Sequence, residues 1–184
     1  TGNGRIGCYV FHPCDAISAY RCCELMANID GMCYMRTHRP AAPFVYPSDE
    51  KLELRGCKQV RSGNHLTLVS CGYMLFTVLE AAERLAAQGT ECNVFDAYTL
   101  PLDPAPIFQA ARAAGGAILT VEDNYTGGLD AELAEWTAQT NDIRAFGMTA
   151  RRMPKSAKTA GEVFAHTGVG LEHIIQRATE LAAR

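Results

Sequence analysis

The sequence predicts an α/β protein with a mostly parallel sheet covered by helices on both faces. Short runs of nearly continuous apolar residues, typical of strands buried on both faces, alternate with segments whose apolar residues recur at helical spacing. The connections are short and carry glycine, proline or aspartate where an element should begin or end. Hydrophobic residues make up 48% of the 184-residue chain and charged residues 20%, so the chain can bury a real core.

The first 45 residues predict only a strand, a helix and a second strand. The apolar run IGCYVFHP (6–13) is β-prone, and Asp15 is a suitable N-cap for a helix from 16 to about 28. MCYM in the stretch 31–36 predicts the second strand. This is too little for a doubly wound domain, so residues 1–45 are interpreted as the end of a larger one.

A connector is expected next. Residues 40–56 carry three prolines and no clean hydrophobic period. We place the connector at 46–60 and a complete domain at 61–184.

The segment 61–184 alternates strands and helices. The apolar runs predict strands at 66–72, 92–100, 116–124 and 143–149. Helical spacing and capping residues predict helices at 75–85, from Asp103-Pro104 to Gly115, around 129–136, from the capping box Thr159–Glu162, and at 171–181.

Composition excludes several classes of protein. The net charge is −3, which argues against a nucleic-acid binder. No apolar run approaches the roughly 18 residues of a membrane helix, and no signal-peptide pattern is present. We expect a soluble cytoplasmic protein with no membrane and no nucleic-acid partner.

The eight cysteines are interpreted as reduced and structural. None forms a Cys-x-x-Cys pair, no spacing matches a zinc site, and several lie in apolar runs, where free cysteine behaves as a small hydrophobe. We therefore expect neither a disulfide framework nor a metal site.

GNGRIG (2–7) matches the letters of a dinucleotide-binding motif but not its context. That motif follows a strand and opens a helix, whereas here a strand follows the glycines. A flexible leader is the preferred interpretation.

Arg36 and His38 follow the second predicted strand. The carboxyl ends of strands are where open α/β sheets bind ligands, and a guanidinium binds phosphate or carboxylate with two hydrogen bonds. The alternative is a structural ion pair made by Arg36 or Arg39, and spacing alone leaves both open. For His38 an exposed or structural role is favoured over a catalytic one.

Glu122 and Asp123 end the strand predicted at 116–124. Paired carboxylates could perform acid–base chemistry, cap the next helix, or pair with arginines at a subunit contact. A structural or interface role is favoured for these two carboxylates. Gly127-Gly128 would permit close approach of the backbone at the start of the helix.

A basic loop covers 150–158. Its four cations could hold an anion or an acidic neighbouring surface, but a solvated loop is the default; they are Arg151, Arg152, Lys155 and Lys158.

Three segments together resemble the C-terminal part of transketolases, most of all the short, animal-type branch. They are MRTHRPAAPFVY, VEDNYTGG and ARRMPKSAKTAGEVF, in this order, and YVFHPCDAISA resembles the strand and helix that precede the first of them. The resemblance covers nearly the whole chain. One departure is Asn124, where the family commonly has histidine after Glu-Asp.

The resemblance implies the end of a pyrimidine-binding domain followed by a transketolase C-terminal domain that supports a homodimer. It implies that Arg36 grips the phosphate of a sugar-phosphate substrate, with His38, Glu122 and Asp123 near an interface or site. The family reaction transfers a two-carbon ketol unit from a ketose phosphate to an aldose phosphate, using thiamine diphosphate and Mg²⁺.

The family residues that hold this cofactor have no counterpart here. No catalytic, cofactor-binding or metal-binding residue is therefore assigned, and the isolated chain is expected to be inactive and to need the remainder of a transketolase. Two alternatives stay open: a non-catalytic interaction or regulatory module with this fold, and the corresponding part of a 1-deoxyxylulose-5-phosphate synthase.

Overall fold

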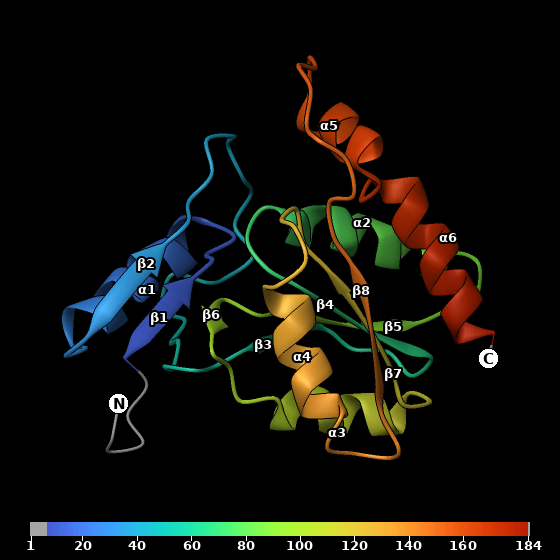
Figure 1. Cartoon of the computed structure of the whole chain (residues 1–184), viewed down its shortest axis with the longest axis horizontal. Helices are drawn as coiled ribbons and strands as arrows, with labels where there is room; N and C mark the ends of the chain where they lie inside the picture. Colours follow the sequence, from blue (N-terminus) through green and yellow to red (C-terminus); the bar gives the residue numbers. More distant parts are fainter. Residues whose placement is uncertain (1–6, 184) are drawn as a thin grey trace.

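The computed structural model describes residues 7–183 and contains two sheets (Figure 1). The smaller sheet has the strand order β2-β1-β6, and the larger has the order β3-β5-β4-β7-β8. Five residues of the GNGRIG stretch, 2–6, lie outside the described residues, so its interpretation stays a prediction. The α/β fold with a mostly parallel main sheet is confirmed.

The smaller sheet combines two strands from the first 45 residues with one strand from the second half of the chain. β1 (Cys8–Phe11) and β2 (Met32–Met35) pair in parallel, with Phe11 opposite Met35. Between them, α1 (Ala16–Ala27) starts at Asp15, which forms a capping box with Ser18. The third strand, β6 (Thr99–Leu100), comes from the second half of the chain and pairs antiparallel with β1.

The larger sheet is parallel except at one edge. β4 (Leu66–Ser70), β5 (Cys92–Asp96), β7 (Ala117–Val121) and β8 (Arg144–Met148) run in parallel. The edge strand β3 (Lys58–Arg61) pairs antiparallel with β5.

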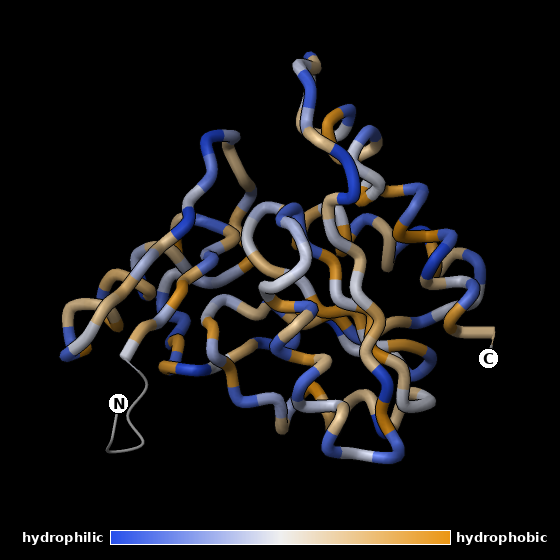
Figure 2. The backbone as a smooth tube through the Cα atoms, viewed as in Figure 1, coloured by the Kyte–Doolittle hydropathy of each residue, from blue (hydrophilic) through white to orange (hydrophobic). Residues whose placement is uncertain are grey.

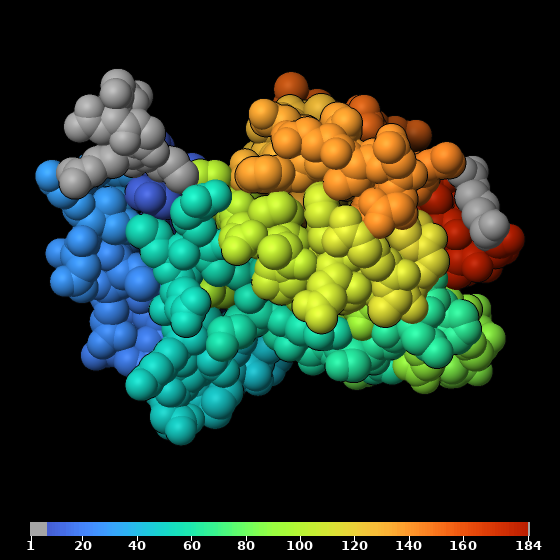
Figure 3. All heavy atoms as spheres, turned by 90° about the horizontal axis from the view of Figure 1, so that it is seen from below, coloured from blue at the N-terminus to red at the C-terminus, as the bar shows by residue number. Residues whose placement is uncertain are grey.

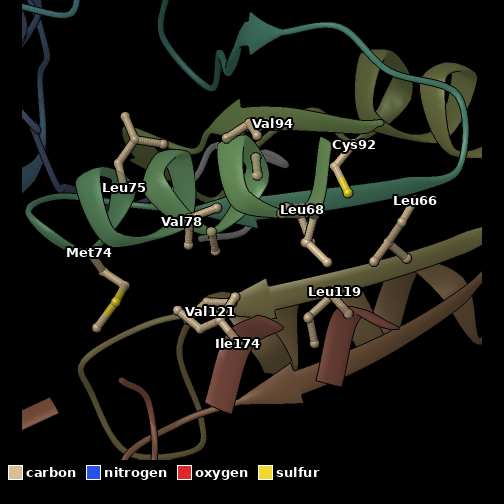
Figure 4. Packing of buried hydrophobic residues seen from close by; sticks show 14 of the residues in the cluster. Leu66, Leu68, Met74, Leu75, Val78, Cys92, Val94, Leu119, Val121 and Ile174 are labelled. Carbon is tan, nitrogen blue, oxygen red and sulfur yellow. The ribbon is translucent and has the colours of Figure 1, made fainter. Parts of the chain in front are cut away.

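Helices cover both faces of this sheet. They are α2 (Met74–Ala86), α3 (Ala105–Ala113), α4 (Leu129–Thr137) and α6 (Leu171–Ala182), while α5 (Ala160–Thr167) packs against α6. On one face, Met74 and Val78 of α2 and Ile174 of α6 pack with strand residues such as Leu68 (Figure 4). On the other face, α3 and α4 form a second cluster that includes Ile107 and Leu133.

The hydropathy of the chain follows these layers. The strands of the larger sheet are mostly apolar, and the segment between β8 and α5 is more hydrophilic (Figure 2). The four cations of that segment, predicted as a basic loop, are all exposed. The segment itself projects from the body of the molecule (Figure 1). Seen from below, the N-terminal unit lies at one end, with α3 on the surface of the larger domain (Figure 3).

Three predicted elements need correction. The strand expected at 92–100 is two strands, because the chain leaves β5 after Asp96 and joins the smaller sheet as β6. β3 lies where a connector was expected; three of its four residues KQVR are polar and three are half-buried, as suits an edge strand. α3 starts one residue later than expected, with Asp103 Oδ1 accepting a hydrogen bond from the Ala105 amide.

The division at 45 and 60 stays a prediction, although the second boundary falls inside β3. All eight cysteines are free thiols, and four of them are buried. None of the helices in the described part of the chain is long and apolar enough to cross a membrane.

Candidate functional site at the strand ends

The carboxyl ends of four strands meet where the two sheets adjoin. His12 follows β1, Arg36 follows β2, Gly72 lies just beyond β4, and Glu122-Asp123 follow β7. The backbones are tied together, because the Arg36 amide donates to Phe11 O at 2.9 Å and the Gly72 amide donates to His12 O at 3.1 Å. Side chains from both sheets therefore share one edge, the usual ligand-binding edge of open α/β sheets.

Arg36 and Asp123 form a bidentate ion pair across this junction. Arg36 Nη1 lies 2.6 Å from Asp123 Oδ1, and Nη2 lies 2.9 Å from Oδ2. The pair is partly buried, with 37% of the Arg36 side chain and 20% of the Asp123 side chain exposed. The hydrogen bonds that Arg36 donates to the Asp123 carboxylate raise the pKa of Arg36. Two residues predicted separately, 87 positions apart, thus meet within one chain.

His12 was not predicted as a site residue. It is 8% exposed, and its ring makes no hydrogen bond to any of the residues 7–183. Burial, followed by the positive charge of Arg36, lowers its pKa to about 4, so the imidazole is neutral at pH 7. The available signal was positional: His12 follows β1 as Arg36 follows β2, and residues in parallel register point to the same face.

His38 has a structural position. Its Nε2 donates a hydrogen bond to Pro13 O at 2.9 Å, and its ring stacks at a tilt against Tyr73 with the centroids 5.5 Å apart. Gly72, at φ +59°, lies so close that an added Cβ would sit 2.8 Å from His38 Cε1. His38 thus holds the loop after β2 against the start of α2.

Glu122 caps the next helix. It is 3% exposed, and its Oε1 accepts a hydrogen bond from the Asp130 amide at 3.1 Å, in the first turn of α4. Gly128 leaves room for it, since an added Cβ there would lie 2.6 Å from Glu122 Oε2. Burial raises the pKa of Glu122 to about 7.

A second buried carboxylate lies under the same junction. Asp96, at the end of β5, is fully buried; its Oδ2 accepts a hydrogen bond from the Tyr46 hydroxyl at 2.8 Å, while Oδ1 has no partner among the described residues. Burial raises its pKa to about 7. The backbone amides of Val45 and Tyr46 donate in turn to Asp15 Oδ2, at 2.7 and 3.0 Å. The start of α1, the connector and β5 are thereby linked by one polar chain.

Two cavities differ in what they offer a ligand. A cavity of about 220 Å³ lies beside the strand ends and is lined by residues that include Asp15, Thr37 and His38. A larger one, about 420 Å³, lies between β3 and α3, at the amino end of β5. Its Asn93 amide is already bonded to Gln59, Gly63 and Thr67, so we favour the strand-end region as the site.

The strand-end cluster suits anion binding better than metal binding. Among residues 7–183, no group of three or more His, Cys, Asp or Glu side chains is placed to hold a metal ion. The guanidinium of Arg36 already holds one carboxylate, and the charges of Arg36 and Asp123 both act on the buried His12. The fold and this cluster define an α/β protein with a paired arginine and aspartate at the edge where its two sheets adjoin.

Comparisons with known proteins identify the family. A family model described as "Transketolase, C-terminal domain" matches residues 56–174. The chain belongs to the transketolase C-terminal domain family, as the resemblance had predicted. It is 36% identical over 176 residues to human transketolase-like protein 2, and 32% identical over 179 residues to human transketolase.

Solved structures agree on the fold. The chain is similar to "Split gene transketolase, inactive beta4 tetramer", with a TM-score of 0.86 at 24% identity, covering 96% of this chain and 58% of that one. It is also similar to transketolase from Leishmania mexicana, with a TM-score of 0.70 at 19% identity, covering 97% of this chain and 26% of that one.

The chain spans only part of these relatives. The matches cover 94% of this chain and 28% of transketolase-like protein 2, and 95% of this chain and 29% of human transketolase.

Proposed function

We propose that this chain is the C-terminal part of a transketolase, a cytoplasmic enzyme that transfers a two-carbon ketol unit from a ketose phosphate to an aldose phosphate. In this proposal the chain binds the substrate phosphate and supports a dimer, and it is not competent alone. The observation that carries the proposal is Arg36, which directly follows β2 and carries a guanidinium able to bind an oxyanion with two hydrogen bonds.

Arg36 would act by orienting the substrate. Binding energy from a remote phosphate can position the reacting carbon, and it can be used where no bond is made or broken. Thiamine diphosphate with Mg²⁺ would supply the chemistry that stabilises a carbanion when bound. In this proposal the remainder of the enzyme holds that cofactor, and no reaction step is assigned to this chain.

The N-terminal unit supports the need for a partner. β2 is hydrogen-bonded only to β1, and its other edge has no neighbouring strand among the described residues. Met32 and Tyr34 on this strand are 69% and 58% exposed. An open edge beside exposed apolar side chains suits a sheet continued by further strands of the parent enzyme.

Reconstitution tests the proposal. The chain is mixed with a polypeptide that carries the thiamine-binding part of a human-type transketolase, and native mass spectrometry with thiamine diphosphate and Mg²⁺ follows assembly while ketol transfer is assayed. We expect a hetero-assembly with activity. A chain that stays alone and takes up no cofactor would contradict the proposal.

Arg36→Ala then tests the site itself. In the active assembly we expect KM for phosphorylated sugars to rise by roughly one to two orders of magnitude, because charged hydrogen bonds are worth about 1.5–3 kcal/mol. Arg39→Ala is the matched control. Arg39 lies three residues after Arg36 and is exposed, so its substitution removes the same charge and should leave KM within about twofold. An unchanged KM in Arg36→Ala would remove Arg36 from the site.

A second candidate is a non-catalytic interaction or regulatory module. One observation favours it: Arg36 is already paired with Asp123, so the chain shows no free arginine fork at this position. Assembly with a partner in the reconstitution experiment, without ketol transfer, would support this candidate.

A further inference from the structure

A cavity of about 420 Å³ lies between the edge strand β3 and the helix α3. None of the residues that line it also lines the cavity beside Asp15 and His38 at the strand ends. Its volume falls within the range of small-molecule sites, roughly 300–1,000 Å³. We refer to it as the β3–α3 cavity; its walls include Gln59 from β3 and Gln109 from α3.

Small side chains on one flank of α3 leave this space unfilled. Ile107 and Ala111 of α3 are fully buried and pack into the core cluster on this face of the larger sheet. The flank that lines the cavity has residues at helical spacing i, i+3, i+4 and i+7, which places them in one stripe. They are Pro106, Gln109, Ala110 and Ala113. Two alanines and a proline fill little volume, so the helix packs its core stripe without closing the space towards β3.

On the sheet side of the cavity, a buried amide orients Gln59. Asn93 in β5 is 3% exposed, and its Oδ1 accepts hydrogen bonds from Gln59 Nε2 at 2.8 Å and from the Gly63 amide at 2.9 Å. Gln59 Nε2 also donates to the carbonyl oxygen of Arg61 at 3.3 Å. Both hydrogens of the Gln59 amide are therefore used within the protein. Its Oε1 remains as an acceptor that has no partner among residues 7–183.

Gln109 supplies the second polar group of the cavity. It is exposed, and its side-chain amide makes no hydrogen bond to any residue that the structure describes. A free carboxamide presents donors and an acceptor side by side, whereas Gln59 presents only an acceptor. A ligand that carries an amino group next to an acceptor atom can satisfy both glutamines.

The β3–α3 cavity favours an uncharged ligand. Among the described residues that line it, Cys57 is the one ionisable group, and burial raises the pKa of its thiol to about 12. An adjoining cavity of about 260 Å³ shares Cys57 and Pro106 with it. The charged residues of that second cavity balance one another; they are Glu53, Arg55, Lys58 and Asp103. Neither cavity therefore offers a net attraction for an anion such as a sugar phosphate.

We propose that the β3–α3 cavity is a second ligand site, separate from the strand ends, that binds the base of an adenine nucleoside. A glutamine carboxamide forms two hydrogen bonds with the N6 and N7 edge of adenine, a pairing known from nucleic-acid recognition. Gln109 makes this pair, and the other N6 hydrogen is donated to Gln59 Oε1. The apolar part of the wall, which includes Phe95 and Ala110, contacts the base. The site does not depend on the proposed function.

Titration of the 184-residue chain with adenosine tests this site. NMR follows the backbone and glutamine side-chain amides of wild type, Gln109→Ala and Ala113→Leu. In wild type we expect the shifts to cluster at Gln59, Gln109 and Ala113. Gln109→Ala loses two neutral hydrogen bonds and should weaken binding roughly tenfold. Ala113→Leu extends an exposed side chain into the cavity and should weaken binding at least about tenfold, while leucine keeps the helix stable.

Two ligands and one variant serve as matched controls. Inosine replaces the amino group of adenosine with a carbonyl, so it has no donor for Gln59 and should bind roughly tenfold more weakly. Adenosine monophosphate adds charge to the same base and should bind no more tightly than adenosine. Gln88→Ala removes another exposed glutamine, just after α2, that makes no side-chain hydrogen bond within the described part of the chain. This variant should bind adenosine as wild type does.

Each outcome decides the proposal. Absence of shifts with adenosine at up to about 10 mM, or shifts confined to the strand ends, overturns the site. Equal binding of inosine and adenosine, or of adenosine to wild type and Gln109→Ala, overturns the assignment of an adenine base. Tighter binding of adenosine monophosphate overturns the assignment of an uncharged ligand. Circular dichroism verifies the fold of each variant, and the reconstitution assay decides the proposed function separately.

Discussion

The two sheets of this protein are built from similar strand–helix units, yet they bury their residues very differently. In the larger domain, all five residues of β4 and all five of β5 are buried. In the N-terminal unit, β2 alternates between exposed and half-buried residues. Four of the exposed large apolar side chains lie in the first 45 residues: Tyr20, Met32, Tyr34 and Phe44.

The two sheets differ in burial because helices cover both faces of the larger one but not of the smaller one. The larger sheet has helices on both faces, and two apolar clusters fill the space between them. The smaller sheet has three strands, one borrowed from the larger domain, and a small cluster around Phe11, Cys22, Leu52 and Tyr98. A parallel sheet is stable when both faces are covered, so the N-terminal unit is the part that a partner should complete.

The largest expected effect contrasts two methionines. Met74→Ala removes a fully buried side chain from the main cluster, and we expect the free energy of unfolding to fall by about 2–5 kcal/mol. Met32→Ala makes the same change at a 69% exposed position and should cost less than about 0.5 kcal/mol in the isolated chain. Urea unfolding measures both, and equal losses would remove the distinction between the two regions.

The next contrast compares two helix N-caps. Asp15 is buried, and its carboxylate accepts hydrogen bonds from Ser18 at the start of α1 and from the amides of Val45 and Tyr46. Asp15→Ala should cost about 2–3 kcal/mol, because three or more donors lose a charged acceptor. Thr159, exposed at the start of α5, accepts a single hydrogen bond from the described residues, donated by the Glu162 amide at 3.3 Å. Thr159→Ala should cost about 0.5–1 kcal/mol, and a reversed order in chemical denaturation would contradict this assignment.

We expect the free energy of unfolding to depend on pH because of the buried Asp96 carboxyl group. The folded state raises the pKa of Asp96 from 3.8 to about 7 and therefore binds this proton more tightly than the unfolded state does. The contribution is fully present below pH 3.8 and is lost as pH rises through 7, by on the order of 4 kcal/mol. Asp96→Asn should remove this slope between about pH 4 and 8.

The difference in unfolding free energy between wild type and Asp96→Asn isolates this group. Glu122, with its pKa raised to about 7, changes stability in the same direction. His12, with its pKa lowered to about 4, acts oppositely, losing stability as pH falls from 6.5 towards 4. A difference that does not vary with pH would show that Asp96 does not titrate in this range.

The smallest effect in the isolated chain is expected on the open face of β2. Tyr34→Ser should change the free energy of unfolding by less than about 0.5 kcal/mol, since Tyr34 is 58% exposed. In the reconstituted assembly the same substitution should weaken association with the thiamine-binding part, measured by native mass spectrometry at several concentrations. Unchanged association would place the partner on another surface.

Local signals predicted most of the elements. Asp15 and Thr159 were recognised as N-caps because capping requires a particular residue type at one position. The strands at 66–72 and 116–124 were recognised because buried strands are continuously apolar. β3 and the break after Asp96 were missed, because an edge strand and a strand that changes sheets are defined by their neighbours.

The sequence by itself determined the fold class, the family resemblance and the placement of Arg36 at a strand end. These depend on residue type, spacing and the order of motifs, all of which are local or linear properties. Only the tertiary structure decided which groups meet there. It joined Arg36 to Asp123 across 87 residues, placed the neutral His12 beside them and assigned Glu122 to the start of α4. The reason is physical: ion pairing and desolvation depend on distance and burial, and the packing of two sheets sets both.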